Sequence, residues 1–308
     1  MKRIFLFLAI LVFSGTVCAD GKMPEPKVVK INERVYVLLG PLGQPSAHNQ
    51  GYMVNSTVIV GDQGVILVDS GGTDEVGRQI DRTIARITPK PVTHVINTHH
   101  HGDHTLGNVA FKGAEILSSE QCKVLVEKTG MDWVRIMESM IGHKLPNTRP
   151  VPASLTFAED TRAERNLQGV RLVLWVPHGS HTPGDMMVYL PDDKILIGGD
   201  ILVNTIIPNM RDANIHNWIG ALAKVQDFDA AAIVPGHGPL MTMPDVVRLQ
   251  RIMTDFYAGV EAGYKKGLTD SEIRGALNLD GWKGLKEYET TMGGNISRAY
   301  LEVEVANF

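Results

Sequence analysis

The stretch THHHGDHTLGN at residues 98–108 constrains the fold most, because it places four histidines and one aspartate within six positions. Imidazole and carboxylate groups are ligands of borderline-soft divalent metals such as zinc, which makes His99, His101, Asp103 and His104 candidate ligands. A single loop histidine more often hydrogen-bonds a backbone carbonyl, but four candidates on one short loop are typical of metal binding. The chain is therefore expected to fold around a metal site.

The local spacing divides these residues between two ions. In extended backbone alternate side chains point to the same side, so His99 and His101 can converge on one ion while His100 points away. After the flexible glycine that follows, Asp103 and His104 can turn toward a second ion. We expect His100 to support the ligands from behind or to pack, without binding metal.

The cluster lies where a predicted strand ends. The run VTHVINT at residues 92–98 is rich in β-branched residues, which puts the histidines on a loop at the carboxyl end of a strand. Elsewhere strand-like runs and helical periodicity alternate in two successive rounds, which predicts two stacked sheets with helices outside. The other predicted strands are 35–40, 51–55, 56–60, 64–71, 114–119, 154–160, 170–176, 186–190, 194–199 and 231–236, and the helices are 73–87, 119–140 and 214–228.

Only helical patterns follow from about residue 243, at 244–267, 269–279 and 295–308. We therefore expect a catalytic domain at residues 24–242 and a C-terminal helical extension at 243–308 packed on it. Periodicity does not decide whether the extension also forms a dimer face, so the oligomeric state stays open.

The first residues have the layout of a secretory signal peptide. Lys2 and Arg3 precede an apolar run at residues 4–13, and small residues lead to Ala19, after which we expect cleavage. Ten apolar residues are too few to span a bilayer comfortably, so removal of residues 1–19 would leave no stable membrane insertion. The mature chain is expected to be periplasmic or secreted.

The charge of the chain argues against nucleic acid as a partner. Its 30 basic and 34 acidic residues give a formal net charge of -4, whereas nucleic-acid-binding proteins usually carry a basic face. With 44% hydrophobic residues among 308, the chain can bury a large core. A small molecule is the expected substrate.

One loop cannot close a metal site, so further ligands must come from other parts of the chain. The stretches PHGSHTPGD, LIGGDILVN and VPGHGP each place a histidine or aspartate after an apolar strand, namely His181, Asp200 and His237. His178 competes with His181 for the first of these positions. With these residues added, two metal ions can be held with room left for water.

These motifs, in this order, resemble the metallo-β-lactamase superfamily across nearly all of the mature chain. The resemblance implies an α/β fold, the αββα four-layer sandwich, with the site along one edge of the sheets. It favours His181 over His178, because the family places a TPG turn after its ligand. The implied ligands are His99, His101 and His181 for the first metal, Asp103, His104 and His237 for the second, and Asp200 bridging both, with Asp69 supporting the ligand loop from behind.

The resemblance implies a hydrolase, and the ligand types favour two zinc ions, with iron or manganese as alternatives. Two ions about 3.5 to 4 Å apart would yield a bridging hydroxide that attacks a carbonyl-type bond in a thioester, ester or lactone. Asp103 is expected to orient this hydroxide and pass on its proton. Substrate contacts are expected from Tyr52, Trp133, Asn204 and Arg211.

The bridging Asp200 resembles that of glyoxalase II-like thioesterases and lactonases, whereas β-lactamase subclasses usually carry cysteine or serine there. The signal peptide, HTLGN in the first motif and SRAYLEVE near the C-terminus resemble exported hydrolases associated with quinoprotein or sulfur-oxidation systems. Three alternatives stay open: β-lactam hydrolysis, a mononuclear iron sulfur dioxygenase, and a catalytically silent periplasmic metal-binding accessory protein. Metal content and turnover would separate them.

Overall fold

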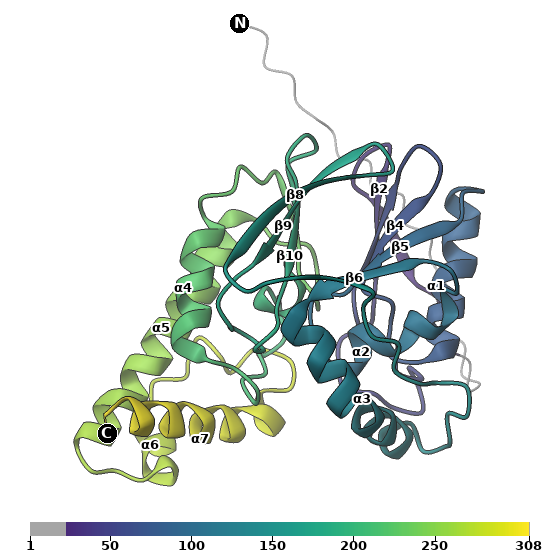
Figure 1. The fold of residues 1–308 in the computed structure, drawn as a ribbon. Coiled ribbons are helices and arrows are strands. Elements are labelled where there is room, and N and C mark those ends of the chain that lie inside the picture. Colours follow the sequence, from purple (N-terminus) through teal and green to yellow (C-terminus); the bar gives the residue numbers. More distant parts are fainter. Residues whose placement is uncertain (1–22, 308) are drawn as a thin grey trace, which may run out of the picture.

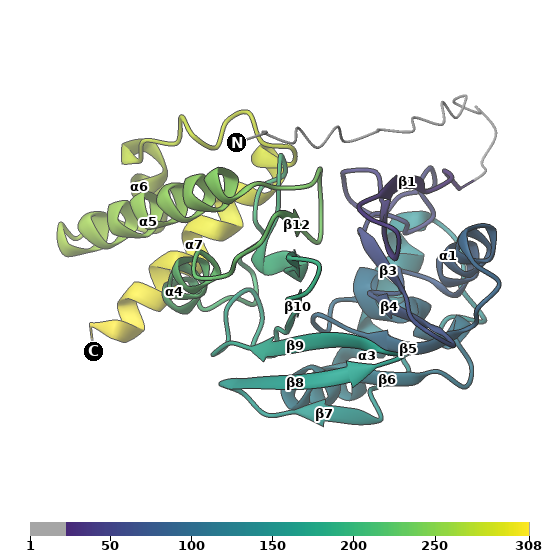
Figure 2. The same ribbon diagram turned by 90° about the horizontal axis from the view of Figure 1, so that it is seen from above.

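Residues 23–307 are described by the computed structural model, and the predicted signal peptide at 1–19 lies outside this range. Within it two β-sheets lie face to face and helices cover their outer faces, as Figures 1 and 2 show from two directions. The chain builds the first sheet, then the second, and ends in helices. Among the helices of residues 23–307, none is both long and apolar enough to cross a membrane.

The first sheet has seven strands in sequential order. They are β1 (Lys27–Lys30), β2 (Val35–Leu39), β3 (Ser56–Val60), β4 (Val65–Val68), β5 (Val92–Ile96), β6 (Glu115–Ser119) and β7 (Leu155–Phe157). Pairing is antiparallel from β1 to β4 and parallel from β4 to β7. The carboxyl ends of β4, β5 and β6 therefore meet at one edge, the usual place for a site in an α/β sheet.

The second sheet has five strands in the order β12-β11-β10-β9-β8. These are β8 (Thr161–Leu167), β9 (Val170–Val176), β10 (Met187–Leu190), β11 (Ile195–Ile197) and β12 (Ala232–Val234). All pairs are antiparallel except β11 with β12, which are parallel. The loops after β11 and β12 consequently leave the sheet at the same edge.

Apolar alternation explains how the sheets stack. Along β9, Val170, Leu172, Leu174 and Val176 are buried in a cluster shared with strands of the first sheet, while Trp175 joins a separate cluster on the outer face. This period of two gives each strand an inner and an outer side. The inner cluster is the core between the sheets, and each outer side is covered by helices.

The helix α1 (Asp74–Ile87) packs on the outer face of the first sheet, where Figure 1 shows it beside β4 and β5. Val76, Ile80 and Ile84 recur at helical spacing and are buried against that sheet. Thr73 caps the helix by accepting a hydrogen bond from the Val76 amide. The helix predicted at residues 73–87 is thus confirmed. The second helix of this half, α3 (Glu120–Ile141), connects β6 to β7.

The C-terminal helices share one core with the second sheet. Helices α4 (Ile215–Val225), α5 (Met243–Lys265), α6 (Asp270–Ala276) and α7 (Tyr288–Ala306) lie on its outer side, as Figure 2 shows for α4, α5 and α7. Trp175 of β9, Trp218 of α4 and Phe256 of α5 belong to one hydrophobic cluster. The boundary predicted at residue 242 falls at Thr242, the N-cap of α5.

Several local predictions are wrong. Residues 51–55 form a loop rather than a strand, and the Asn55 amide donates to the carbonyls of Pro235 and Gly238 instead of joining a ladder. The edge strands β1 and β8 were not predicted, because exposed charged residues hide their alternation. The helix predicted at 295–308 starts earlier, at Tyr288.

Candidate metal centre

All seven predicted ligands lie on loops at the carboxyl ends of strands, between the two sheets. His99 follows β5, and the chain then turns into the short helix α2 (Gly102–Thr105), continued by the 3-10 helix η1 (Leu106–Ala110). His101 is the N-cap residue of α2 and has extended backbone, and α2 carries Asp103 and His104, so the chain turns after His101 as expected. The remaining three come from the second sheet: His181 after β9, Asp200 in η2 (Gly199–Ile201) after β11, and His237 after β12.

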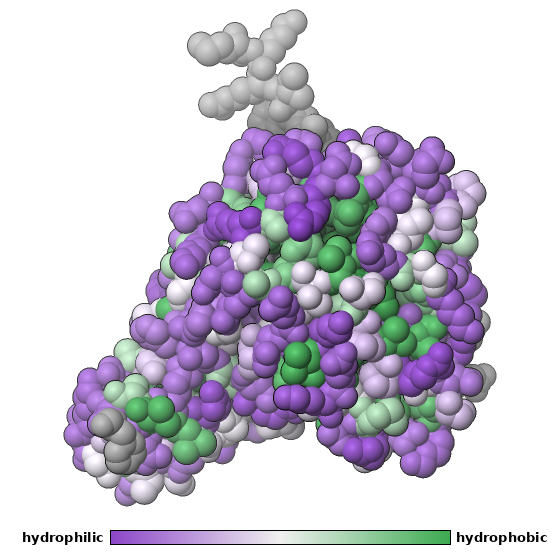
Figure 3. All heavy atoms as spheres, in the orientation of Figure 1, coloured by the Kyte–Doolittle hydropathy of each residue, from purple (hydrophilic) through white to green (hydrophobic). Residues whose placement is uncertain are grey.

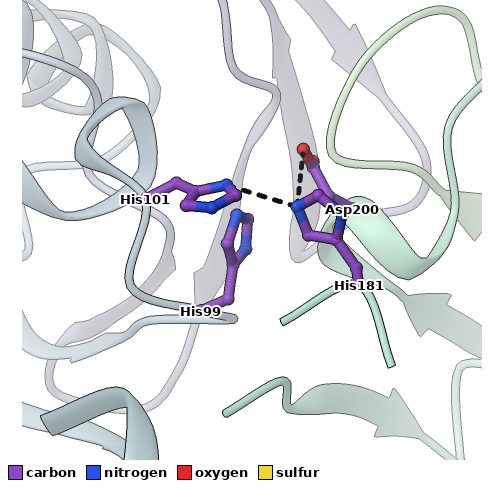
Figure 4. Close-up of side chains that lie close together, drawn as sticks. All are labelled: His99, His101, His181 and Asp200. Atoms are coloured by element: carbon purple, nitrogen blue, oxygen red, sulfur yellow. Dashed lines mark hydrogen bonds and ion pairs between the residues drawn. The ribbon is translucent and has the colours of Figure 1, made fainter. Parts of the chain in front are cut away.

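Four of these residues form a first donor set, made of His99, His101, His181 and Asp200. One ligand atom from each lies within 4.8 Å of the others. Figure 4 shows the three imidazole rings and the carboxylate pointing toward one another, with His181 Nε2 3.2 Å from His101 Nδ1 and 3.7 Å from Asp200 Oδ2. This arrangement of nitrogen and oxygen donors suits a zinc ion.

Asp103, His104 and His237 form a second donor set, again with ligand atoms within 4.8 Å of one another. His237 Nε2 lies 3.1 Å from Asp103 Oδ2 and 3.4 Å from Asp200 Oδ2, and His104 Nε2 lies 3.3 Å from Asp200 Oδ1. The Asp200 carboxylate therefore touches both donor sets. It is placed as a ligand shared by two ions would be.

Unpartnered atoms test whether a metal fits. His99 Nε2, His104 Nε2 and Asp200 Oδ1 are buried, and within residues 23–307 none of them has a hydrogen-bond partner. An orphaned buried polar atom is costly, and divalent cations held by the two donor sets would satisfy all three. The donor chemistry and these orphaned atoms both fit metal binding.

Hydrogen bonds from the opposite ring nitrogens orient three of the histidines. His104 Nδ1 lies 2.8 Å from Asp69 Oδ2, and His237 Nδ1 donates to the Met53 carbonyl at 3.0 Å. His101 Nε2 lies 2.9 Å from Asp212 Oδ2. Each bond places an N–H on the far nitrogen and turns the near nitrogen toward the other donors, where it can bind metal once it carries no proton.

Asp69 lies behind the ligand loop, as the sequence predicted, and holds more than one group. It accepts hydrogen bonds from the amide and hydroxyl of Thr98, both at 2.8 Å, in addition to its contact with His104. Its backbone adopts φ +60°, a left-handed conformation that non-glycine residues rarely take. This one carboxylate ties β4 to the start of the ligand loop.

Asp212 is the residue that sequence reasoning missed. It lies in the loop before α4, half-buried, and contacts a ligand that is 111 positions away in the chain. No apolar strand or glycine motif precedes it, so the pattern that revealed the other acidic residues is absent. An acidic residue beside Arg211 in the loop after Asp200 was the one available signal.

The two donor sets differ in electrostatics. Burial lowers the pKa of His99 well below its usual value and that of His181 to about 3, so both imidazoles are neutral. Burial also opposes charge on His104 and His237, but nearby carboxylates outweigh it. Asp103, Asp69 and Asp200 raise the pKa of His104, and Asp200 and Asp103 raise that of His237 to about 10.

Two other histidines lie outside the facing donor sets. His100 is buried beside His101, with ring centroids 4.7 Å apart, and burial lowers its pKa to about 3. With His101 and Asp212 it forms another group whose ligand atoms lie within 4.8 Å of one another, and this group shares only His101 with the first donor set. His178 is exposed and lies near Glu159 and Asp160, so the structure brings His181 rather than His178 to the site.

A cavity of about 150 Å³ opens beside the donors. Trp133 and Arg211 line it, with Arg211 stacked 4.9 Å from the Trp133 ring. The other two predicted substrate contacts lie elsewhere. Tyr52 is fully buried in the core under the first sheet, and the Asn204 amide donates to Pro239 in the loop that follows His237. A larger hollow of about 630 Å³ between α5 and α6 lies away from the donors.

Comparison with known protein families gives a match to the model described as "Metallo-beta-lactamase superfamily" over residues 49–237. That range contains all of the candidate ligands. Two curated relatives are a linear primary-alkylsulfatase of Pseudomonas sp., 26% identical over 79% of this chain, and a type 2 metallo-beta-lactamase of Bacteroides fragilis, 25% identical over 77%. The match covers 54% of the alkylsulfatase, so this chain spans about half of its length, and 90% of the lactamase.

Solved structures show the same fold. A metallo-beta-lactamase from Pontibacter korlensis superposes with a TM-score of 0.60 and 23% identity, covering 74% of this chain and 99% of its own. A stereoselective inverting sec-alkylsulfatase from Pseudomonas sp. gives 0.68 and 18%, covering 89% of this chain and 50% of its own. The predicted four-layer α/β sandwich with C-terminal helices is thereby confirmed.

Proposed function

Because the chain belongs to the metallo-beta-lactamase superfamily, we propose that it is an exported dinuclear zinc hydrolase that cleaves a thioester, ester or lactone of a small molecule. Membership places it among the metal-dependent hydrolases. The observation that carries the finer proposal is the pair of donor sets that face each other across Asp200. Each set supplies three protein ligands besides the shared carboxylate.

His99, His101 and His181 would hold one ion, Asp103, His104 and His237 the other, with the Asp200 carboxylate shared. When bound, two zinc ions supply an activated water at neutral pH and a Lewis acid for the scissile carbonyl. The protein's part is to orient the donors through the far nitrogens of its histidines.

We assign Asp103 a catalytic role. It lines the cavity, and His104 and His237 hold the pKa of its carboxyl low despite burial. The carboxylate is therefore ionised at neutral pH and can accept a hydrogen bond from the attacking water. This contact would fix the direction of attack and give the departing proton an acceptor.

Elemental analysis and a substrate panel on one sample test the proposal. We expect two zinc ions per chain and turnover of a thioester or lactone. A cephalosporin in the same panel tests β-lactam hydrolysis. One iron per chain without hydrolysis would contradict the proposal and favour the sulfur dioxygenase, and bound zinc without turnover of any compound would favour an accessory protein.

Export is a separate part of the proposal. Its support is the sequence alone: two basic residues, an apolar run and small residues up to Ala19. N-terminal sequencing of the protein from fractionated cells should find Asp20 as the first residue, outside the cytoplasm. A cytoplasmic chain that still begins at Met1 would contradict export.

A second candidate is hydrolysis of an alkyl sulfate. The observation that favours it is the extent of the structural match, which reaches 89% of this chain for the alkylsulfatase and 74% for the Pontibacter lactamase. The curated relative named as a linear primary-alkylsulfatase matches over 79% of the chain. A linear alkyl sulfate added to the panel would be turned over faster than the thioester if this candidate is right.

A further inference from the structure

The cavity beside the donors is too small for a whole drug-sized molecule. Its volume of about 150 Å³ is below the roughly 300 to 1,000 Å³ of typical ligand pockets. Only the reacting end of a substrate fits inside. The remainder must lie on the surface that surrounds the opening, so the chemistry of that surface bears on the class of substrate.

One wall of the opening is an apolar face of α3. Trp133, Ile136, Met137 and Met140 line the cavity and recur at the three- and four-residue spacing of a helix face. The Trp133 ring lies 4.9 Å from the ring of the ligand His101. The apolar wall therefore begins at the metal centre and continues outward along the helix.

At its outer end the apolar wall includes solvent-exposed side chains. Ile136 is 37% exposed and Met140 is 39% exposed. Figure 3 shows a surface that is mainly hydrophilic, with apolar side chains in separate patches. Ile206 and Ile207, from the segment after Asp200, also line the cavity and belong to the hydrophobic core. We call Trp133, Ile136, Met140, Ile206 and Ile207 the apolar rim.

Besides the donors, two charged residues line the cavity, the anion Glu287 and the cation Arg211, and the charge of Arg211 is already compensated. The Arg211 guanidinium lies 3.1 Å from Asp212 and stacks on Trp133. Its charge is thus partly neutralised, and its flat face adds to the wall. The rim favours an apolar group over a second anion.

We propose that the substrate carries a linear acyl or alkyl chain on its scissile group, and that this chain lies along the apolar rim. The inference rests on the proposed function, because it names the class of molecule that the same site would cleave. Burial of the chain on Ile136 and Met140 would remove apolar surface of both partners from water. The flexible side chain of Met140 can adapt to chains of different length.

A series of acyl thioesters with two to ten carbons tests this inference on the zinc-loaded protein. We expect kcat/KM to rise by up to about fourfold per added methylene, the limit for full burial, until the chain outgrows the rim. In the double variant Ile136→Gln/Met140→Gln this dependence on length should largely disappear. Alkyl sulfates of the same lengths show whether the chain belongs to an acyl or an alkyl group.

Met131→Gln is the matched control. Met131 lies on the same helix and is 48% exposed, but it does not line the cavity. This variant should keep the full dependence on chain length. Loss of that dependence to the same degree in Met131→Gln and in the double variant would overturn the inference, as would turnover of short and long thioesters at equal kcat/KM by the unaltered protein.

A binding measurement separates this inference from the proposed function. Calorimetry with linear carboxylates of two to ten carbons should give a Kd that falls with length in the unaltered protein and not in the double variant. If no thioester or sulfate is hydrolysed, the proposed function fails while this binding result still decides the inference. Length-independent binding, together with self-association that the double variant abolishes in sedimentation, would assign the rim to a second copy of the chain and overturn it.

Discussion

The two donor sets use similar ligands but are prepared differently for a metal. In the first, burial holds His99 and His181 in the neutral form, which binds metal directly. In the second, carboxylates keep His104 and His237 protonated, so protons occupy the places of a cation. A metal ion that binds at the first set therefore competes little with protons. Binding at the second set requires His104 and His237 to release theirs. Asp200, which touches both, links the two.

The largest effect is expected at this shared residue. Asp200→Ser removes a carboxylate from both sets, so both ions should be lost, and activity should fall by more than the roughly 10- to 100-fold that loss of an outer partner costs. Elemental analysis after dialysis measures the metal content. The value of kcat/KM on the best substrate of the panel measures the activity. Selective loss of one ion would contradict a bridge.

Replacement of one ligand of the first donor set should remove the metal of that set without emptying the second set. His101→Ala should empty the first set and abolish hydrolysis, while the second keeps part of its metal through its own three ligands. His100→Ala is the matched control, because its ring is adjacent to His101 but belongs to neither facing donor set, and its metal content should stay nearly unchanged. Equal metal loss in both variants would mean that the ligands were wrongly assigned.

A smaller effect is expected at Asp212, which acts on the first set through His101. Asp212→Asn should weaken retention of the first ion by about 10- to 100-fold, because an amide orients the imidazole less strongly than a carboxylate does. Competition with a chelator measures this affinity. Asp132→Asn, an exposed change on α3, should leave it unaltered, and the same result for Asp212→Asn would remove its positioning role.

The smallest effect is expected when the pH is changed and zinc affinity is measured. The pKa of His237 in the metal-free protein is raised to about 10, so the stability gained from its charge is complete below about pH 6.5 and is lost as the pH rises through 10. Zinc must displace this proton, so affinity at the second set should rise with pH from 6 to 9. At the first set, where the pKa of His181 is about 3, affinity should vary much less.

Calorimetry in two buffers of different ionisation enthalpy provides the measurement. One zinc ion should bind with little proton release, and the other should release about one proton or more near pH 7. Equal release for both ions would mean that the two sets do not differ as their surroundings indicate.

The seven donors were predictable because each follows an apolar strand at a glycine- or proline-rich turn, a local pattern that the sequence displays. Asp212 was not, because its role depends on a contact between two sheets and has no local signature. Tyr52 was misplaced for a related reason. It was assigned to a strand and expected to contact substrate, whereas the loop at 51–55 turns its side chain into the core.

Prediction of the fold from the sequence has the same limit, as the charged edge strand β8 shows. Its exposed arginine and glutamate residues hide the period of two, and pairing with β9 over seven positions fixes it as a strand. Tertiary pairing overrides local preference in such segments. The sheets and helices that bury apolar residues were therefore predicted, and the edges that remain in water were not.

The contacts of Asp69 bear on how the protein folds and acquires metal. Asp69 fixes the ligand loop through Thr98 and His104 with hydrogen bonds that involve no metal, and on the other side of the site the hydrophobic core reaches the donors, where Trp218 packs 5.0 Å from the His181 ring. Contacts without metal therefore hold the ligand loop on both sides, and we expect the chain to reach its folded shape before it acquires metal.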